Sequence, residues 1–169
     1  MRTAFRSRRE RCGSRGGVGE RKDRLIADPA LIQHWLHRRS GLPLQKGFHG
    51  VAREVDGRIV AAFGYDYFQG SSCCLHTATD YPWGYNRALL TKAFKVPFEQ
   101  WGYNCLISII QSGNLSSLNM SRRLGFTEFA VLPGAHPSGG LHFGVMYRDD
   151  CRWLLPHEGW NEWRRRKRT

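Results

Sequence analysis

The sequence predicts a single α+β domain in which helices pack on a mixed β-sheet. A strong hairpin signal, Asp56-Gly57, separates two strand-like runs. After this hairpin, strand-like and helix-like segments alternate twice, which is the order that places parallel strands in one sheet. The 169 residues have 41% hydrophobic content, which is enough for one sizeable core and leaves little for a second domain.

The first predicted element is a helix in residues 28–39. Asp28 is a suitable N-cap, and Pro29 fits the first helical position, where no amide donor is needed. An apolar stripe at helical spacing consists of Leu31, Trp35 and Leu36. His34 and His37 are three residues apart, a spacing that can bind a metal, but the sequence offers no third ligand. We therefore expect an ordinary surface pair and no metal site.

The next elements are a hairpin in residues 49–70 and a further strand in residues 71–79. In the second strand of the hairpin, alternate residues are expected on one face of the sheet: Ile59, Ala61, Phe63, Tyr65 and Tyr67. Gly70 marks the turn into the following strand.

Residues 87–101 read as a helix with apolar positions at Leu90, Phe94, Phe98 and Trp101. Pro97 lacks a backbone donor, so we expect a kink or a short break near it. A strand at 104–112, a helix at 114–124 and strands at 126–133 and 141–148 complete the domain, with a turn at 136–140 between the last two. Asn114 and Gly125 fit the two ends of that last helix.

The charge is concentrated at the ends of the chain. The formal net charge is +12; residues 1–24 hold 9 Lys/Arg against 3 Asp/Glu, and residues 157–169 hold 5 against 2. We expect 1–24 to be a basic arm without order of its own, 25–156 to be the folded domain and 157–169 to be a basic tail. Each end either contacts a polyanion or is simply solvated, and the first could also precede the true start of the protein.

The cysteine pattern predicts reduced thiols. The five cysteines are Cys12, Cys73, Cys74, Cys105 and Cys151. No C-x-x-C pair and no Cys/His spacing typical of zinc occurs. The chain also has no apolar run of the roughly 18 residues that a membrane helix needs, so we expect a soluble, intracellular protein.

Segments in the second half of the chain carry a resemblance to a known family. "NLSSLNMSRRLGF" is similar to an Asn-x-x-(Ala/Ser) segment that ends in Leu-Gly-Phe, and "SGGLHFGVMYR" follows as a Gly-bearing turn and closing strand. On these motifs residues 28–155 resemble the GCN5-related N-acetyltransferase (GNAT) superfamily. "FKVPFEQWGYN", "RRLGF" and "FGVMYRDDCRWL" are similar to a subgroup common in bacteriophages and bacteria. The resemblance implies a three-layer fold whose central, mainly antiparallel sheet splays between two parallel strands.

The resemblance further implies transfer of an acetyl group from acetyl-CoA to an amine. In that fold the fourth strand binds the pantetheine arm, and the loop opening the next helix binds pyrophosphate, because free amides at a helix start attract anions. The cofactor-binding residues it implies are Leu75, Thr77, Gly84, Tyr85, Asn86, Arg87, Asn114 and Ser117.

Two positions depart from the family pattern. The usual pyrophosphate loop reads (Arg/Gln)-x-x-Gly-x-(Gly/Ala), whereas this chain offers only Gly84 before Asn86 and Arg87. Arg87 is expected either to pair with a phosphate or to be a solvated residue of the first helical turn. Ser121 stands where many members have a Tyr that protonates the leaving thiolate, so either it positions a water or the thiolate leaves without specific help.

The catalytic residues that we expect are His76, Asn114 and Ser121. His76 is the first candidate for the base that takes a proton from the amine, because an imidazole exchanges protons readily near neutral pH. The alternative is a packed or surface histidine. Glu54 and Glu128 are weaker candidates, since exposed carboxylates on strands are common.

The sequence therefore predicts a cytoplasmic N-acetyltransferase that uses acetyl-CoA as co-substrate, in the host cytoplasm if a bacteriophage encodes it. The acceptor is an amine of a small molecule or a protein, attacking the thioester directly. The alternative is a GNAT-like protein without catalysis that binds nucleic acid or another polyanion through its basic ends. A homodimer stays open, because Trp153, Trp160 and Trp163 either cover the core or form a subunit contact.

Overall fold

The fold is that of a computed structural model, which describes residues 22–156. The strands are β1 (Asp23–Ile26), β2 (His49–Val55), β3 (Arg58–Asp66), β4 (Ser72–Thr79), β5 (Cys105–Gln111), β6 (Thr127–Pro133) and β7 (Gly140–Tyr147). The α-helices are α1 (Pro29–Ser40), α2 (Arg87–Lys95) and α3 (Leu115–Leu124). The seven strands form one sheet in the order β1-β2-β3-β4-β5-β7-β6. Within it β4 and β5 pair in parallel, and every other pair of neighbours is antiparallel.

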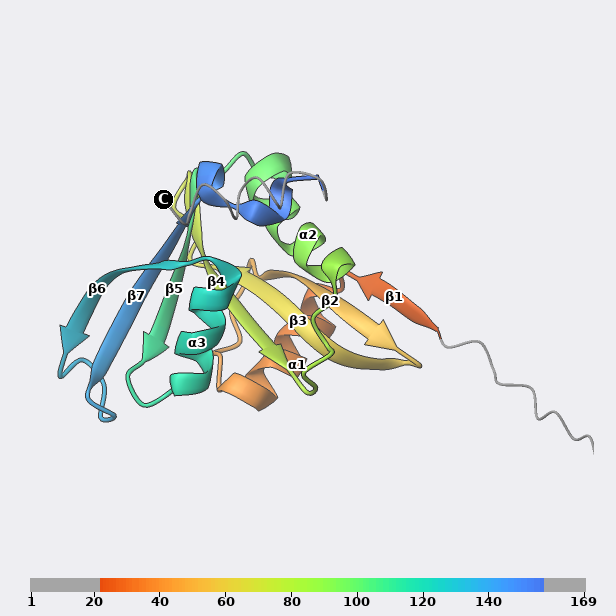
Figure 1. Cartoon of the computed structure of the whole chain (residues 1–169). Helices are drawn as coiled ribbons and strands as arrows, with labels where there is room; N and C mark the ends of the chain where they lie inside the picture. The colour runs from red at the N-terminus through yellow and green to blue at the C-terminus, as the bar shows by residue number, and fades with distance from the viewer. Residues whose placement is uncertain (1–21, 157–169) are drawn as a thin grey trace, which may run out of the picture.

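Helices cover the two faces of the sheet unequally (Figure 1). Helix α1 packs on one face of β2, β3 and β4, around a buried cluster formed by Ile32, Trp35, Leu36, Leu42, Phe48, Ala52, Ile59 and Ala62. Helices α2 and α3 lie on the other face, over a larger cluster to which both contribute. The predicted three-layer α+β fold with a mixed, mainly antiparallel sheet is therefore confirmed.

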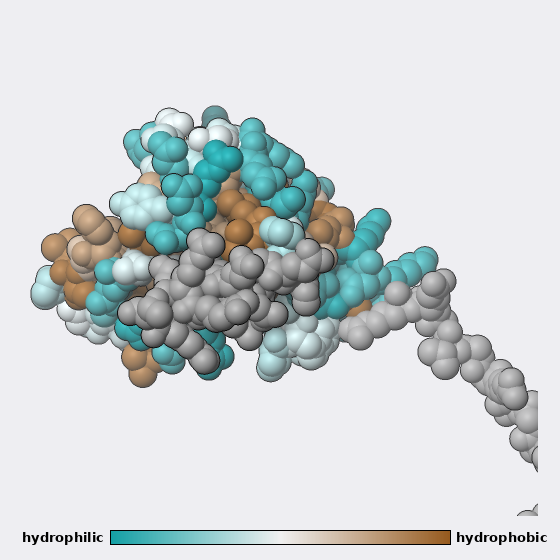
Figure 2. Space-filling view, turned by 45° about the horizontal axis from the view of Figure 1, so that its top comes forward, coloured by the Kyte–Doolittle hydropathy of each residue, from teal (hydrophilic) through white to brown (hydrophobic). Residues whose placement is uncertain are grey.

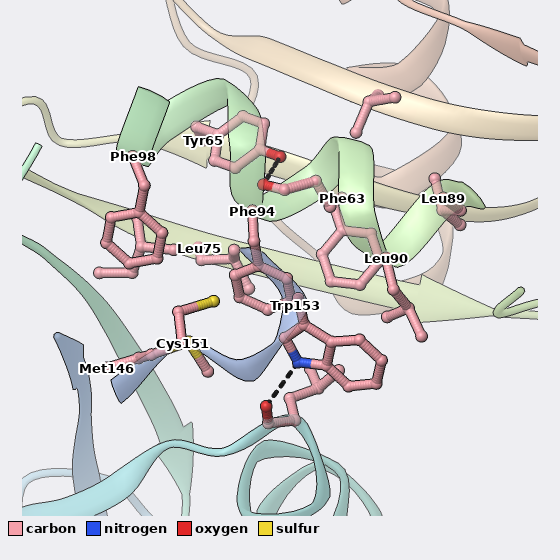
Figure 3. Packing of buried hydrophobic residues seen from close by; sticks show 14 of the residues in the cluster. Phe63, Tyr65, Leu75, Leu89, Leu90, Phe94, Phe98, Met146, Cys151 and Trp153 are labelled. Carbon is pink, nitrogen blue, oxygen red and sulfur yellow. Dashed lines mark hydrogen bonds between the residues drawn. The ribbon is translucent and has the colours of Figure 1, made fainter. Parts of the chain in front are cut away.

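The larger cluster joins the C-terminal segment to α2 and α3 (Figure 3). The rings of Phe94 and Trp153 stack with centroids 6.1 Å apart, and Trp153 Nε1 donates to the carbonyl of Leu124 over 2.7 Å. Tyr65 Oη donates to the carbonyl of Ala93 over 2.6 Å. Trp153 is thus a core residue, whereas Trp160 and Trp163 lie outside the described residues.

The β2–β3 hairpin turns at Asp56 and Gly57, as predicted. Both residues have positive φ, 50° and 78°, which suits the tight turn between twisted strands. The predicted one-face alternation needs a correction. Arg53 pairs with Ala61 while Glu54 pairs with Ile59, so the register shifts by one residue in the hairpin.

The register shift sends Ile59 to the α1 side, while Ala61, Phe63 and Tyr65 face the larger cluster. Tyr67 follows the strand, has φ 47° and is exposed. This register shift is a β-bulge, and no local sequence signal marks it. It places on two faces of the sheet residues that strict alternation would place on one face.

Two further boundaries differ from or refine the sequence-based expectation. Helix α2 ends at Lys95, and a π-helical turn, Val96–Gln100, follows, closed by Trp101 N donating to Val96 O over 3.1 Å. This is the break predicted at Pro97. Strand β1 was not predicted: Asp23 and Arg24, assigned to the basic arm, pair with β2 and belong to the sheet.

The two basic segments lie mostly outside the described residues, so their predicted roles stay predictions. Within residues 22–156, none of the helices is both long and apolar enough to cross a membrane.

Candidate active site

The site begins where β4 and β5 separate. Their parallel pairing runs from Ser72↔Cys105 to Cys74↔Ile107 and stops there. Beyond that point β4 remains paired with β3 and β5 with β7, so both strands continue without pairing with each other. Because each strand carries backbone donors and acceptors on both edges, the two facing edges can bind an extended ligand between them.

A cavity of about 580 Å³ occupies this opening. Such a volume is typical of sites for small molecules and cofactors. It is lined by β4, β5, α3 and the end of α1, by residues that include Arg39, Leu75, His76, Thr77, Tyr85, Ser108, Asn114, Ser117 and Ser121. Among the described residues that line the cavity, none is acidic.

His76 lines the cavity and is held by a buried carboxylate. Its Nε2 atom lies 2.7 Å from Oδ1 of Asp66, which is 2% exposed. Oδ2 of the same carboxylate accepts from Nε2 of Gln45 over 3.3 Å. Because a carboxylate accepts, the shared hydrogen is on Nε2, and in the neutral imidazole the lone pair is then on Nδ1. The Asp66 carboxylate therefore fixes the orientation of the His76 ring beside the cavity.

A second polar group fixes the rim of the cavity on the α1 side. Arg39 donates through Nε and Nη2 to the two oxygens of Asp80, each over 2.6 Å. Its guanidinium also lies 3.6 Å from the ring centroid of Trp35. Two charge-assisted bonds and the ring contact hold Arg39 in one orientation.

The α3 side of the cavity carries the predicted Asn114, Ser117 and Ser121. Asn114 Oδ1 accepts from the amide of Ser117 over 3.0 Å, so its side chain caps α3, as expected. Ser121 Oγ lies 3.2 Å from Oγ of Ser108 on β5. The two hydroxyls bridge the helix and the strand, and both line the cavity.

Tyr85 closes the cavity near the start of α2. Its hydroxyl lies 2.7 Å from Oγ1 of Thr77, which in turn donates to the carbonyl of Ala62 over 2.8 Å. Burial raises the pKa of Tyr85 to about 12, so the phenol is neutral at physiological pH. Leu75, Thr77 and Tyr85, all predicted to bind the cofactor, are brought together here.

Three of the predicted cofactor-binding residues lie in the loop that precedes α2 and in the first turn of that helix. The cavity lining includes Tyr85 but not Gly84, Asn86 or Arg87. Asn86 caps α2 by accepting from Leu89 N over 2.8 Å, and Arg87 Nη2 donates to Leu155 O over 3.4 Å. These three predicted residues therefore lie beside the cavity, at the start of α2.

Arg53 holds this loop to the sheet. Its Nη1 donates to the carbonyls of Trp83 and Gly84 over 2.8 and 3.2 Å, while Nε and Nη2 donate to Asp23 over 2.9 and 2.5 Å. Because trans peptide groups are planar, a Gly84 carbonyl that points at Arg53 directs the amide of Tyr85 away from it. Gly84 itself has no room for a side chain, since a Cβ would lie 2.1 Å from Oγ1 of Thr79.

The two weaker candidates for the base are engaged elsewhere. Glu54 accepts from Nε of Arg24 over 2.7 Å, and Glu128 lies 2.8 Å from Nδ1 of His142. Neither Glu54 nor Glu128 lines the cavity between β4 and β5. Across residues 22–156 no three His, Cys, Asp or Glu side chains cluster as a metal site.

Sequence reasoning did not find Asp66, Gln45, Arg39 or Ser108. Asp66 ends a run of apolar strand residues and is buried. An acidic residue at the end of such a run was the sequence signal that could have identified it. The other three are ordinary polar residues in the sequence, and only the folded chain brings them to the cavity.

A sheet that splays between two parallel strands, with a cavity in the opening, is the architecture of the GNAT class of N-acetyltransferases, the class that the sequence resembles. The structure matches the spermidine N-acetyltransferase SpeG from Vibrio cholerae in complex with CoA and spermine at TM-score 0.61 and 11% identity, covering 79% of this chain and 98% of that one.

The dodecameric form of the Vibrio cholerae enzyme in an intermediate state matches at TM-score 0.60 and 9% identity, over 75% of this chain and 94% of the other. Glutamate-to-glutamine mutant forms of the same enzyme match at TM-score 0.61 and 9% identity, over 76% of this chain and 96% of the other. These likenesses show the fold. No protein-family model matches the sequence, and no curated protein matches it either. The predicted bacteriophage subgroup stays a prediction.

Proposed function

We propose that the protein is an acetyl-CoA-dependent N-acetyltransferase. The observation that carries the proposal is the end of β4–β5 pairing at Cys74↔Ile107, followed by the 580 Å³ cavity between the two strands. The residues present fit a CoA thioester: unpaired strand edges suit the amide-containing pantetheine arm. The start of α2 beside the cavity suits a pyrophosphate, because first-turn amides and the helix dipole attract anions.

In the reaction that we propose, His76 takes a proton from the acceptor ammonium through Nδ1. The neutral amine then attacks the thioester carbonyl, a C–N bond forms, and the C–S bond breaks with its electron pair leaving on sulfur. A backbone amide of β4 donates to the oxyanion that develops on the carbonyl. The nitrogen loses its second proton as the amide forms, and the thiolate gains this proton through a water, for which the hydroxyls of Ser121 and Ser108 offer a position.

The acceptor that we propose carries one reactive amine and no second ammonium group near it. One structural neighbour is crystallised with spermine, a polycation. The described cavity lining here holds Arg39 and His76 and no acidic side chain. Since the one buried carboxylate nearby, Asp66, is bonded to His76, a polycation would find no partner charge among these residues. An acceptor whose groups other than the reactive amine are neutral or anionic suits the cavity better.

The proposal is tested first by thermal unfolding with acetyl-CoA at increasing concentrations. We expect the midpoint to rise with ligand concentration, because a ligand that binds only the folded state stabilises it. Release of free thiol in an amine screen would then establish transfer. If millimolar acetyl-CoA leaves the midpoint unchanged, the proposal fails. Salt-sensitive nucleic acid binding lost on deleting residues 1–24 would then support the alternative predicted from the basic ends.

A further inference from the structure

A second, smaller cavity lies beside the cavity between β4 and β5 and shares two hydroxyls with it. The small cavity has a volume of about 20 Å³, which exceeds the roughly 10–15 Å³ that one water molecule needs. Ser108 and Ser121 line both cavities, and their Oγ atoms lie 3.2 Å apart. The lining of the small cavity also includes Arg122, Glu128 and His142. The two hydroxyls therefore lie between the proposed active site and a group of charged and titratable side chains.

Strand pairing brings these side chains to one face of the sheet. Ser108 pairs with Gly144, and Gly144 pairs with Glu128, so the three residues form a row across β5, β7 and β6. His142 lies two residues before Gly144 and shares its face. A Cβ at Gly144 would lie 2.5 Å from Oγ of Ser108 and 3.5 Å from Oγ of Ser121. The missing side chain at Gly144 thus keeps the small cavity open next to both hydroxyls.

Glu128 holds the imidazole of His142. Nδ1 of His142 lies 2.8 Å from Oε2 of Glu128, and Nη2 of Arg122 lies 3.7 Å from the same oxygen. Because a carboxylate accepts, the hydrogen of this bond is on Nδ1, and Nε2 is the ring nitrogen that can exchange a proton with another group. The side chain of His142 is 20% exposed and that of Glu128 is 43% exposed. The imidazole is therefore the more enclosed member of the pair.

The Glu128–His142 pair differs in character from the strands that carry it. Glu128 is the only charged residue of β6, and His142 is the only histidine of β7, which has no charged residue. Figure 2 shows apolar surface, in brown, on the side of the molecule where β6 lies in Figure 1. The pair is thus a polar contact between two mostly apolar strands, and it lies on the face that carries the two hydroxyls.

We propose that His142 exchanges protons with the leaving sulfur through a water in the small cavity and the hydroxyl of Ser121. This inference rests on the proposed function. A serine hydroxyl gives up its proton only if it regains another at once, because its own pKa is far above neutral. An imidazole gains and loses a proton readily near neutral pH. His142 therefore supplies the exchange that the hydroxyls by themselves lack.

The proton balance starts from protonated His142. As the C–S bond breaks and its electron pair stays on sulfur, sulfur takes a proton from the Ser121 hydroxyl, the hydroxyl takes one from the water, and the water takes one from Nε2 of His142. The second proton of the acceptor nitrogen then enters the same path and returns His142 to its protonated form. The net transfer is one proton from nitrogen to sulfur, and His142 ends as it began.

The test compares two acetyl donors whose thiols differ in acidity, with the full chain and a primary monoamine from the amine screen as acceptor. One donor is acetyl-CoA. The other is the acetyl thioester of an aromatic thiol, whose thiolate leaves without needing a proton. We expect His142→Gln to lower kcat with acetyl-CoA about 10- to 100-fold, with little change in acetyl-CoA affinity. With the aromatic thioester the rate should stay within about two-fold of the wild type.

Two further variants locate the effect. His136→Gln is the matched control, because His136 lies in the turn between β6 and β7, contacts Ser138 and lines neither cavity. Its rates should equal those of the wild type with both donors. Gly144→Ala fills the small cavity, so it should slow transfer from acetyl-CoA selectively. The double variant with His142→Gln should be no slower than the slower single variant, because both changes interrupt one path.

Two results would overturn the inference while leaving the proposed function intact. One is an unchanged kcat with acetyl-CoA in His142→Gln. The other is an equal loss with both donors, which would show that His142 only supports the fold. A folded wild-type protein that transfers no acetyl group from acetyl-CoA to any amine would instead overturn the proposed function, and this inference with it. Thermal unfolding of each variant confirms that it is folded under the assay conditions.

Discussion

Nε2 of His76 lies 2.7 Å from Oδ1 of Asp66, and the two residues come from neighbouring strands, β4 and β3. The Asp66 side chain is 3% exposed and that of His76 is 25% exposed. The carboxylate is therefore enclosed, while the imidazole reaches the cavity. This arrangement fixes both the ring orientation and the tautomer of the group that we propose as the base.

Asp66→Asn should lower kcat about 10- to 100-fold with little change in acetyl-CoA affinity, because the imidazole loses the acceptor that fixes its tautomer. Histidine ¹⁵N chemical shifts should show loss of the Nε2–H tautomer. In a His76→Ala background the same change should have almost no further effect on kcat. Additive losses would show that Asp66 acts independently of His76.

Gly84→Ala should weaken acetyl-CoA binding and lower the unfolding midpoint. An added Cβ would lie 2.1 Å from Oγ1 of Thr79 and 2.9 Å from the carbonyl of Val60, so the loop before α2 must move. Gly134→Ala is a control, because Gly134 has φ 73° with open space around it and probes backbone strain alone. Calorimetry of acetyl-CoA binding separates the two variants: equal affinities would mean that the loop position is unimportant for the ligand.

Arg53→Met should reduce acetyl-CoA affinity more than kcat at saturation. The change removes the donors to the carbonyls of Trp83 and Gly84, and with them the constraint on the amide of Tyr85. A short acetyl thioester without the pyrophosphate provides the comparison. The kcat/KM for this short thioester should be nearly the same in Arg53→Met and in the wild type. A similar fall in kcat/KM for the short thioester and for acetyl-CoA would indicate general damage to the fold.

Trp153→Phe should destabilise the fold by about 1–2 kcal/mol, because a buried hydrogen bond to Leu124 and part of the stacking on Phe94 are lost. Denaturant unfolding measures the change. Tyr81→Phe is the control, since Tyr81 is 45% exposed and its change should alter the free energy of unfolding by less than about 0.5 kcal/mol.

Alkaline conditions should destabilise the protein partly through Tyr85. Burial raises its pKa to about 12 from the ordinary value of 10, so the folded state favours the neutral phenol. The resulting stability is fully present below pH 10 and is lost as the pH rises through 12. Burial raises the pKa of Cys73 and Cys151 to about 12 in the same way. Denaturant unfolding between about pH 9 and 11 should show a shallower decline for Tyr85→Phe than for the wild type; identical slopes would contradict this account.

The elements that the sequence predicted are those with local causes. Asp28 and Asn114 each accept from an amide three residues ahead, and Asp56-Gly57 turns the hairpin through its own backbone angles. Strand β1 was missed because four residues beside a basic segment are too few to carry a periodic signal, and they are held by pairing with β2. The register shift in the hairpin likewise depends on the partner strand.

For the candidate site, the sequence by itself brought His76, Asn114 and Ser121 into consideration, because motif spacing and residue chemistry are readable along the chain. Only the tertiary structure joined His76 to Asp66 and tied the α2 loop to Arg53. The physical reason is that these relationships link residues 10 and 30 positions apart. Strand pairing and helix packing decide them, and neither is encoded in any short segment.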